Sequence, residues 1–242
     1  MILALACCTA VLVVALALGY LAFSPSSQRF GKVHCAGLEK ASRIIALTFD
    51  DGPNEPFTSQ VLEILDASGV TATFFVIGKN AERYPDTIRA ITGSGHVLAN
   101  HSYAHTYSLP FAVEAAIERD VRKAETVIHG LTGLRTALFR PPHGLRTPRF
   151  IRALQRLGYS LVTWNDMTND YDARESSERI AAAIVKRARP GGIINLHDGR
   201  HLRHGVDRAN MIEALPTIIS ELRRRGYAFV SLHELLHVEA YQ

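Results

Sequence analysis

The chain has 242 residues, of which 47% are hydrophobic and 21% are charged. This ordinary globular balance excludes a disordered chain, and the length suits one α/β domain with a short appendage. The formal net charge of +4 is spread along the chain without a known nucleic-acid-binding motif, so no nucleic-acid partner is expected. The three cysteines, Cys7, Cys8 and Cys35, lie near the N-terminus, which excludes a disulfide framework and a cysteine nucleophile in the rest of the chain.

Residues 1–23 carry no charged side chain. As a helix they would extend roughly 30–35 Å, enough to cross a bilayer. One interpretation is an uncleaved transmembrane anchor, which the lack of a basic n-region favours, and the other is a secretory signal peptide. Either interpretation places the remaining chain outside the cytoplasm, anchored or secreted, although Arg29 and Lys32 argue against export by the positive-inside tendency. A buried core helix is the third interpretation, and so uniform an apolar composition disfavours it.

Residues 24–41 are polar and irregular and predict a linker, followed by a folded domain at 42–238 and a tail at 239–242. Within the domain, short apolar segments that predict strands alternate with amphipathic segments that predict helices. The expected strands are 43–49, 72–76, 96–99, 137–139, 160–163, 192–196 and 227–230. The expected helices are 58–68, 85–94, 111–130, 148–157, 177–188, 211–225 and 232–238. This alternation is typical of a parallel sheet that is buried on both faces.

About seven parallel strands fit either an incomplete barrel or an open, doubly wound sheet. Polar motifs follow the ends of five different strands, at Asp50-Asp51, Asn100-His101, Arg140, 164–170 and His197-Asp198. An open sheet gathers its site at one switch point, whereas a barrel brings several strand ends together. We therefore predict an α/β fold, a distorted and incomplete (β/α) barrel with about seven parallel strands, preceded by the N-terminal apolar helix.

The sequence TFDDGP at 48–53 places two adjacent carboxylates at the end of the first expected strand. Asp50 and Asp51 would face opposite sides of a regular strand, but Gly52-Pro53 ends it and the turn can direct both into one pocket. Two close carboxylates repel each other unless a cation compensates. One interpretation is a metal on one carboxylate with the other left as a base, and the alternative is a solvated turn.

The sequence NHSYAH at 100–105 carries two histidines four residues apart. In a helical turn His101 and His105 would share one face, the spacing by which one segment offers two imidazoles to Zn²⁺. With one carboxylate they would form a site that keeps positions open for water and substrate. Because the chain has 11 histidines, a chance pair without a metal is the alternative.

Further polar residues follow later strands. Pro141 stiffens the loop that would present the Arg140 guanidinium to a carboxylate, the alternative being an arginine on the surface. Trp164, the only tryptophan, is either a core residue or a platform for substrate. His197 follows a strand, and the ordinary pKa of a histidine, near neutrality, suits a general acid. The loop 199–204, rich in Arg and His, either contacts an anionic glycan or faces solvent.

Together and in this order, these motifs resemble the polysaccharide deacetylase family, which includes peptidoglycan, chitin and nodulation deacetylases. The resemblance covers roughly residues 42–236, and its most specific pieces are TFDDGP and HSYAH. It implies a metal-dependent hydrolase that removes N-acetyl groups from an amino-sugar polymer, such as peptidoglycan or a chitin-like oligosaccharide, and releases acetate. It also implies a divalent metal, commonly Zn²⁺, with Co²⁺ or another divalent ion as alternatives.

The resemblance implies roles for individual residues. Asp51, His101 and His105 match the metal ligands. Asp50 matches the general base, Arg140 the arginine that orients it, His197 the general acid, and Asp170 the acidic residue that tunes that histidine. The backbone N–H of His143 falls where the family helps to form its oxyanion hole, and Leu196 and Trp164 are assigned to the substrate pocket.

Three positions depart from the family pattern. His143 stands where the family usually has Tyr, and Met167 and Tyr171 replace the first Asp and the Trp of the motif D-x-x-D-W. A glycan-binding pseudoenzyme on the same fold and an amide hydrolase for a non-sugar substrate therefore remain as rival hypotheses. A phosphatase with an aspartate nucleophile is disfavoured, because it would need D-x-D spacing on the first strand, whereas Asp50 and Asp51 are adjacent. The expected partners are an N-acetylated glycan and, through residues 1–23, a membrane, and no protein partner is predicted.

Overall fold

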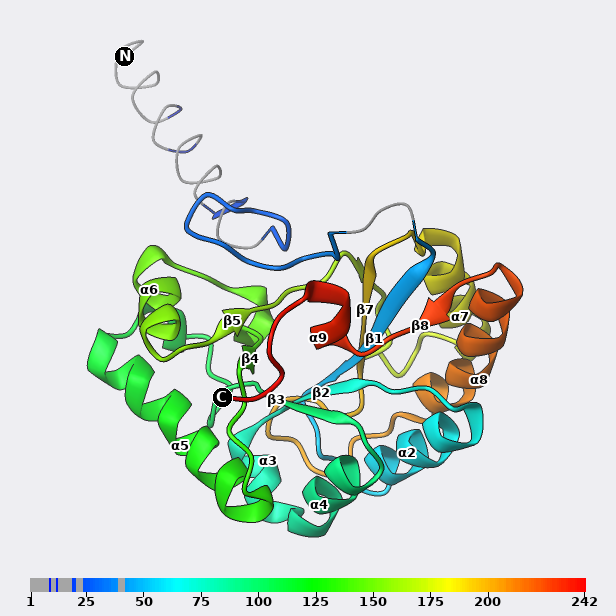
Figure 1. Cartoon of the computed structure of the whole chain (residues 1–242), viewed down its shortest axis with the longest axis horizontal. Coiled ribbons are helices and arrows are strands. Elements are labelled where there is room, and N and C mark those ends of the chain that lie inside the picture. The colour runs from blue at the N-terminus through cyan, green and yellow to red at the C-terminus, as the bar shows by residue number, and fades with distance from the viewer. Residues whose placement is uncertain (1–8, 10–11, 13–18, 21–23, 39–41) are drawn as a thin grey trace.

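A computed structural model of the chain describes residues 9, 12, 19–20, 24–38 and 42–242 (Figure 1). The predicted anchor or signal peptide at 1–23 lies almost entirely outside the described residues, so the N-terminal apolar helix stays a prediction. Within the described ranges, no helix combines the length and the apolar character that crossing a membrane requires.

The sheet is parallel throughout, and seven of its strands follow the path β5-β4-β3-β2-β1-β7-β6, while β8 pairs with the start of β1. The strands are β1 (Ile44–Asp50), β2 (Thr73–Val76), β3 (Val97–Asn100), β4 (Leu138–Phe139), β5 (Ser160–Leu161), β6 (Asp166–Met167), β7 (Gly192–His197) and β8 (Ala228–Phe229). In the described part of the chain, the two ends of the path, β5 and β6, are not paired with each other. The predicted incomplete parallel α/β barrel is therefore confirmed.

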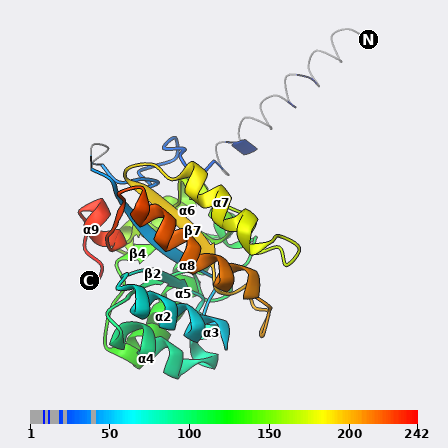
Figure 2. The same ribbon diagram turned by 90° about the vertical axis from the view of Figure 1, so that its right-hand side faces the viewer.

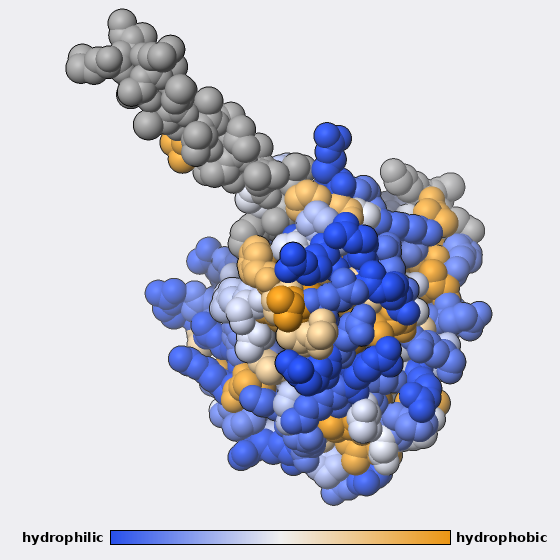
Figure 3. Space-filling view, turned by 90° about the vertical axis from the view of Figure 1, so that its left-hand side faces the viewer, coloured by the Kyte–Doolittle hydropathy of each residue, from blue (hydrophilic) through white to orange (hydrophobic). Residues whose placement is uncertain are grey.

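Helices surround the sheet on its outside, and α7 and α8 run side by side along one flank (Figures 1 and 2). They are α2 (Phe57–Ser68), α3 (Gly78–Arg83), α4 (Pro85–Gly93), α5 (Glu114–Thr132), α6 (Pro148–Arg156), α7 (Ser177–Arg187), α8 (Ala209–Arg224) and α9 (Leu232–Leu236). Two of them end at glycines in the left-handed conformation, Gly69 after α2 and Gly133 after α5, where a side chain would be strained. The face that carries α5 and α6 is mostly hydrophilic, with smaller apolar patches (Figure 3).

The helix α3 and the strand β6 were not predicted. The helix α3 has only six residues and follows β2 directly, so it is too short to show a helical period. The strand β6 has two residues and, among the residues that the structure describes, pairs only with β7, through Asp166 and Met167. Both elements are set by their tertiary neighbours, which a local pattern does not contain.

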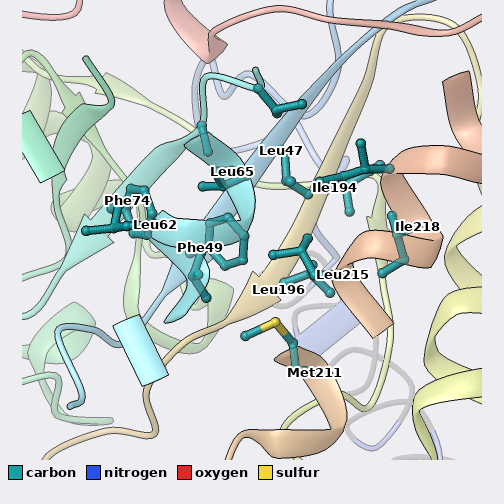
Figure 4. Close-up of a cluster of buried hydrophobic side chains, with 14 of the residues drawn as sticks. Leu47, Phe49, Leu62, Leu65, Phe74, Ile194, Leu196, Met211, Leu215 and Ile218 are labelled. Atoms are coloured by element: carbon teal, nitrogen blue, oxygen red, sulfur yellow. The ribbon is translucent and has the colours of Figure 1, made fainter. Parts of the chain in front are cut away.

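Alternate residues of β1 face two different environments. Leu47 and Phe49 point outward into a core against α2 and α8, where Phe49 stacks on Phe74 with ring centroids 5.1 Å apart (Figure 4). On the other face, Ala46 packs into the cluster that includes α9. Thr48 and Asp50 follow on the same inner face, because every second residue of a strand points to the same side. This face of β1 is therefore apolar at Ala46 and polar toward the carboxyl end of the strand.

The described part of the expected linker lies against the domain. Val33 is buried, and the backbone of His34 pairs with Val162 just beyond β5. The N–H of Gly37 donates to the carbonyl of Gly191, directly before β7. This segment therefore connects the residues that follow β5 with those that precede β7.

Candidate active site

Three potential metal ligands meet at the carboxyl ends of β1 and β3. Oδ1 of Asp51 lies 3.1 Å from Nε2 of His105 and 3.5 Å from Nε2 of His101, and the two imidazole nitrogens are 3.1 Å apart. Ligands of a tetrahedral Zn²⁺ with bonds of about 2.0–2.1 Å lie roughly 3.3 Å from one another. All three residues are buried, and their spacing fits such an ion.

The protonation of these groups also fits a metal. Burial acts to raise the pKa of Asp51, but His105 and His101 lower it well below its usual range, so the group is a carboxylate. Burial lowers the pKa of His105 well below its usual range, which keeps the ring neutral. Nδ1 of His101 lies 2.7 Å from the carbonyl oxygen of Arg140, and donation to that oxygen leaves Nε2 as the free lone pair.

The turns that present these residues hold unusual backbone conformations. Asp51, His105, His143 and His201 all have positive φ, between 50° and 73°, in the region that side chains usually avoid. Such conformations cost of order 1–3 kcal/mol each and gather at functional sites. The backbone N–H of His201 donates to Oδ2 of Asp51 over 2.9 Å, which ties one of these turns to the carboxylate.

The neighbouring carboxylate, Asp50, has a different environment. Nη1 of Arg140 donates to its Oδ1 over 2.6 Å, and Nδ2 of Asn195 donates to its Oδ2 over 3.0 Å. The same guanidinium donates to the hydroxyl of Thr48 and the carbonyl of Thr163 and lies 4.0 Å from the Phe75 ring centroid. Arg140 is fully buried, so Asp50 is held as one half of an internal ion pair.

His197 forms a second coupled pair with Asp170. Nδ1 of His197 lies 3.1 Å from Oδ1 of Asp170, and the backbone N–H of His197 donates to Oδ2 over 2.7 Å. Burial disfavours the imidazolium, but the charge and hydrogen bond of Asp170 outweigh it and raise the pKa of His197 to about 9. The imidazole is therefore charged at neutral pH and can donate a proton.

These groups surround one pocket of about 310 Å³, at the small end of the range for ligand sites. Its lining comprises Asp50, Asp51, His101, His105, Tyr107, His143, Trp164, Met167, Tyr171, His197, Arg200 and His201. Arg140 and Asp170 contact lining residues from behind. Of the predicted site residues, only Leu196 is turned away from this pocket, because its side chain joins Leu215 and Met211 in the core against α8 (Figure 4).

The departures from the family motifs also lie at the pocket. The His143 ring stacks on Tyr107 with centroids 3.5 Å apart and planes 2° from parallel. Tyr171 meets His197 edge-on at 5.5 Å, and Met167 lines the wall beside Trp164.

Four residues that hold or line this site were given no individual role from the sequence. Thr48 and Asn195 lie two residues before Asp50 and His197 on the same strands, so the period of two was the signal that could have found them. Tyr107 and His201 lie on irregular segments whose course no local pattern predicts.

The sequence profile of the polysaccharide deacetylase family matches residues 38–162. A peptidoglycan-N-acetylglucosamine deacetylase from Bacillus cereus is 35% identical over 195 residues, which cover 80% of this chain and 88% of that protein. A chitooligosaccharide deacetylase from a Bradyrhizobium species is 34% identical over 203 residues and covers 80% and 91%. A crystal structure of a peptidoglycan N-acetylglucosamine deacetylase superposes with a TM-score of 0.81 at 28% identity, covering 87% of this chain and 95% of the other. The chain is therefore a hydrolase that belongs to the polysaccharide deacetylase family.

Proposed function

We propose that this protein is a metal-dependent N-deacetylase that acts outside the cytoplasm on an acetylated amino-sugar polymer and releases acetate. The observation that carries the proposal is the pairing of Asp50 with His197 across neighbouring strands, in register in β1 and β7. This pairing places a carboxylate and a charged imidazole on one pocket with the Asp51, His101 and His105 cluster. A base, an acid and a metal site on one pocket are the parts that amide hydrolysis needs.

The metal site belongs to Asp51, His101 and His105 in this proposal. Zn²⁺ suits one carboxylate and two neutral imidazoles, although Co²⁺ fits the same set. When bound, the ion supplies Lewis-acid polarisation of the acetamide carbonyl and acidifies water in the site.

Asp50 is the proposed general base, which takes a proton from the attacking water. Arg140 and Asn195 each bind one of its oxygens, so the carboxylate is fixed in orientation. The backbone N–H of His143 is the proposed donor to the oxyanion that forms from the acetyl carbonyl. His197 then donates its proton to the leaving nitrogen, and the C–N bond breaks to give acetate and a free amine.

The substrate class rests on two considerations. The similar proteins named above carry peptidoglycan and chitooligosaccharide in their names. The lining of the pocket includes Trp164, Tyr171 and Tyr107, whose rings can pack against sugar faces, and the cation Arg200. We infer an N-acetylated glycan, with peptidoglycan favoured where Arg200 meets an anionic group.

The experiment that tests this function measures acetate release from peptidoglycan and from neutral chitooligosaccharides. Metal-free protein, prepared with a chelator, should release none, and added Zn²⁺ or Co²⁺ should restore release. Tight glycan binding without acetate release from the reloaded protein would identify a pseudoenzyme instead.

Substitution of Arg200 tests the preference for an anionic glycan. Arg200→Gln should slow release from peptidoglycan more than release from chitooligosaccharides. Arg203→Gln is the matched control, because Arg203 lies on the same loop but does not line the pocket. Equal losses of activity on both substrates in Arg200→Gln would show that Arg200 does not recognise the negative charge of peptidoglycan.

A further inference from the structure

A second group of imidazoles lies on the other side of His105. His105, His143 and His201 each offer a ring nitrogen, and these nitrogens lie within 4.8 Å of one another. Nε2 of His105 faces Asp51 and His101, whereas its Nδ1 lies 3.1 Å from Nδ1 of His201. The ring of His105 therefore stands between two clusters of potential ligands.

The geometry of this outer group is that of a tripod. The ring centroid of His105 lies 4.5 Å from that of His143 and 4.7 Å from that of His201. The ring centroids of His143 and His201 are 4.7 Å apart. Nitrogen donors on a tetrahedral ion lie roughly 3.3 Å apart, so the 3.1 Å approach of two Nδ1 atoms suits a shared ion. Three histidines around an open position form a known zinc ligand set.

One nitrogen of this group has no partner among the described residues. Nε2 of His143 is buried and makes no hydrogen bond there, whereas buried polar atoms ordinarily have a partner. His143 and His201 are partly exposed, which leaves the group open to solvent.

We propose that His105, His143 and His201 bind a second divalent transition-metal ion at the mouth of the pocket, with His105 shared between the two sites. Its Nε2 serves the inner ion and its Nδ1 the outer one, and the proton on Nδ1 is released to solvent when the second ion binds. An all-nitrogen set selects Zn²⁺, Cu²⁺ or Ni²⁺ and excludes Mg²⁺ and Ca²⁺.

The outer ion has a direct consequence for the pocket. His143 and His201 line the pocket that is proposed to admit the acetylated sugar. An ion between them occupies part of that space, so metal beyond one equivalent inhibits the enzyme. The binding site itself does not depend on the proposed deacetylation, whereas this inhibition does.

Metal stoichiometry tests the proposal. Metal-free protein is titrated with Zn²⁺ in a calorimeter, and bound zinc is measured by elemental analysis after gel filtration. The intact chain should bind two ions. His201→Gln and His143→Phe should each bind one, and the second change keeps an aromatic ring to stack on Tyr107. His204→Gln is the matched control, since this exposed histidine of the same loop should leave both ions bound.

A single ion in the intact chain overturns the proposal and leaves His201 as a hydrogen-bond partner of His105. Two ions retained in both His201→Gln and His143→Phe overturn it as well. Acetate release from the same samples should fall between one and two equivalents of Zn²⁺ in the intact chain, and this fall should be absent in His201→Gln. Zinc counts remain informative even if no acetate is released, so failure of the outer site is distinguishable from failure of the proposed function.

Discussion

The two walls of the pocket are built in different ways. The buried wall comprises Asp50, Asp51, His101 and His105, each at most 6% exposed and each in contact with polar partners inside the protein. The loop wall comprises Trp164, Met167 and Tyr171, which are partly exposed, and Tyr171 reaches 37%.

The family motifs are intact on the buried wall, whereas two of the three departures lie on the loop wall. A residue held by several internal bonds cannot change without leaving its partners unsatisfied, and a residue that faces solvent can. We infer that the buried wall sets the reaction and that the loop wall sets the fit of the glycan.

The largest expected effect is on the buried wall, at Asp50. Asp50→Asn removes the proposed base but keeps the size of the side chain, so kcat should fall by ~10²–10⁴-fold while Zn²⁺ stays bound. Acetate release and zinc content are measured on the same preparation. Asp86→Asn, an exposed carboxylate remote from the pocket, is the control and should change neither. Activity that survives in Asp50→Asn would remove the base assignment.

The second effect is on stability, at Arg140. Arg140→Met leaves the Asp50 carboxylate buried without its cation, which should cost about 3–5 kcal/mol in the free energy of unfolding. Arg89→Met breaks a surface ion pair with Asp86, and the loss there should stay below about 1 kcal/mol. Urea denaturation measures both variants. Equal losses would show that the buried wall is no more tightly held than the surface.

The third effect concerns pH, because Asp170 raises the pKa of His197. The imidazolium contributes stability that is fully present below pH 6.5, the ordinary pKa, and is lost as the pH rises through about 9. Asp170→Asn lowers the pKa of His197, so the alkaline limbs of both kcat/KM and stability should move to lower pH.

At neutral pH, kcat of Asp170→Asn should fall by about one order of magnitude, less than the roughly 10²–10⁴-fold that a general acid contributes. Profiles between pH 6 and 10 are compared with those of Asp172→Asn, whose carboxylate pairs with Arg174 instead. An alkaline limb that does not move in Asp170→Asn would show that Asp170 does not set the pKa of His197.

The buried wall was also the more predictable one. The adjacent carboxylates of TFDDGP and the spacing of His101 and His105 are local patterns, and the structure brings all four residues to one pocket. The two histidines nevertheless lie on an irregular segment after β3 and not in the helical turn that their spacing suggested. Leu196 was assigned to the pocket by its motif, but it lies between Asn195 and His197 on β7, and the period of two turns it into the core.

The loop wall and the outer histidines resist such prediction. His201 and Tyr107 lie on irregular segments whose course depends on contacts made far along the chain, such as the 2.9 Å bond from the His201 backbone to Asp51. No local periodicity encodes contacts of this kind. The parallel barrel, by contrast, follows from the alternation of apolar strands and amphipathic helices, which each segment carries by itself.

The smallest effect is expected on the loop wall, at Tyr171. Tyr171→Trp restores the family residue, and the ring lies edge-on to His197, where an aromatic contact contributes about 0.5–1.5 kcal/mol. A change within that range alters KM for a chitooligosaccharide by at most about tenfold and leaves kcat nearly unchanged, because no group of the buried wall moves. Initial rates over a range of substrate concentrations separate the two constants. A fall in kcat as large as that of Asp50→Asn would show that Tyr171 acts on the proton donor itself, and the two walls would then share the reaction.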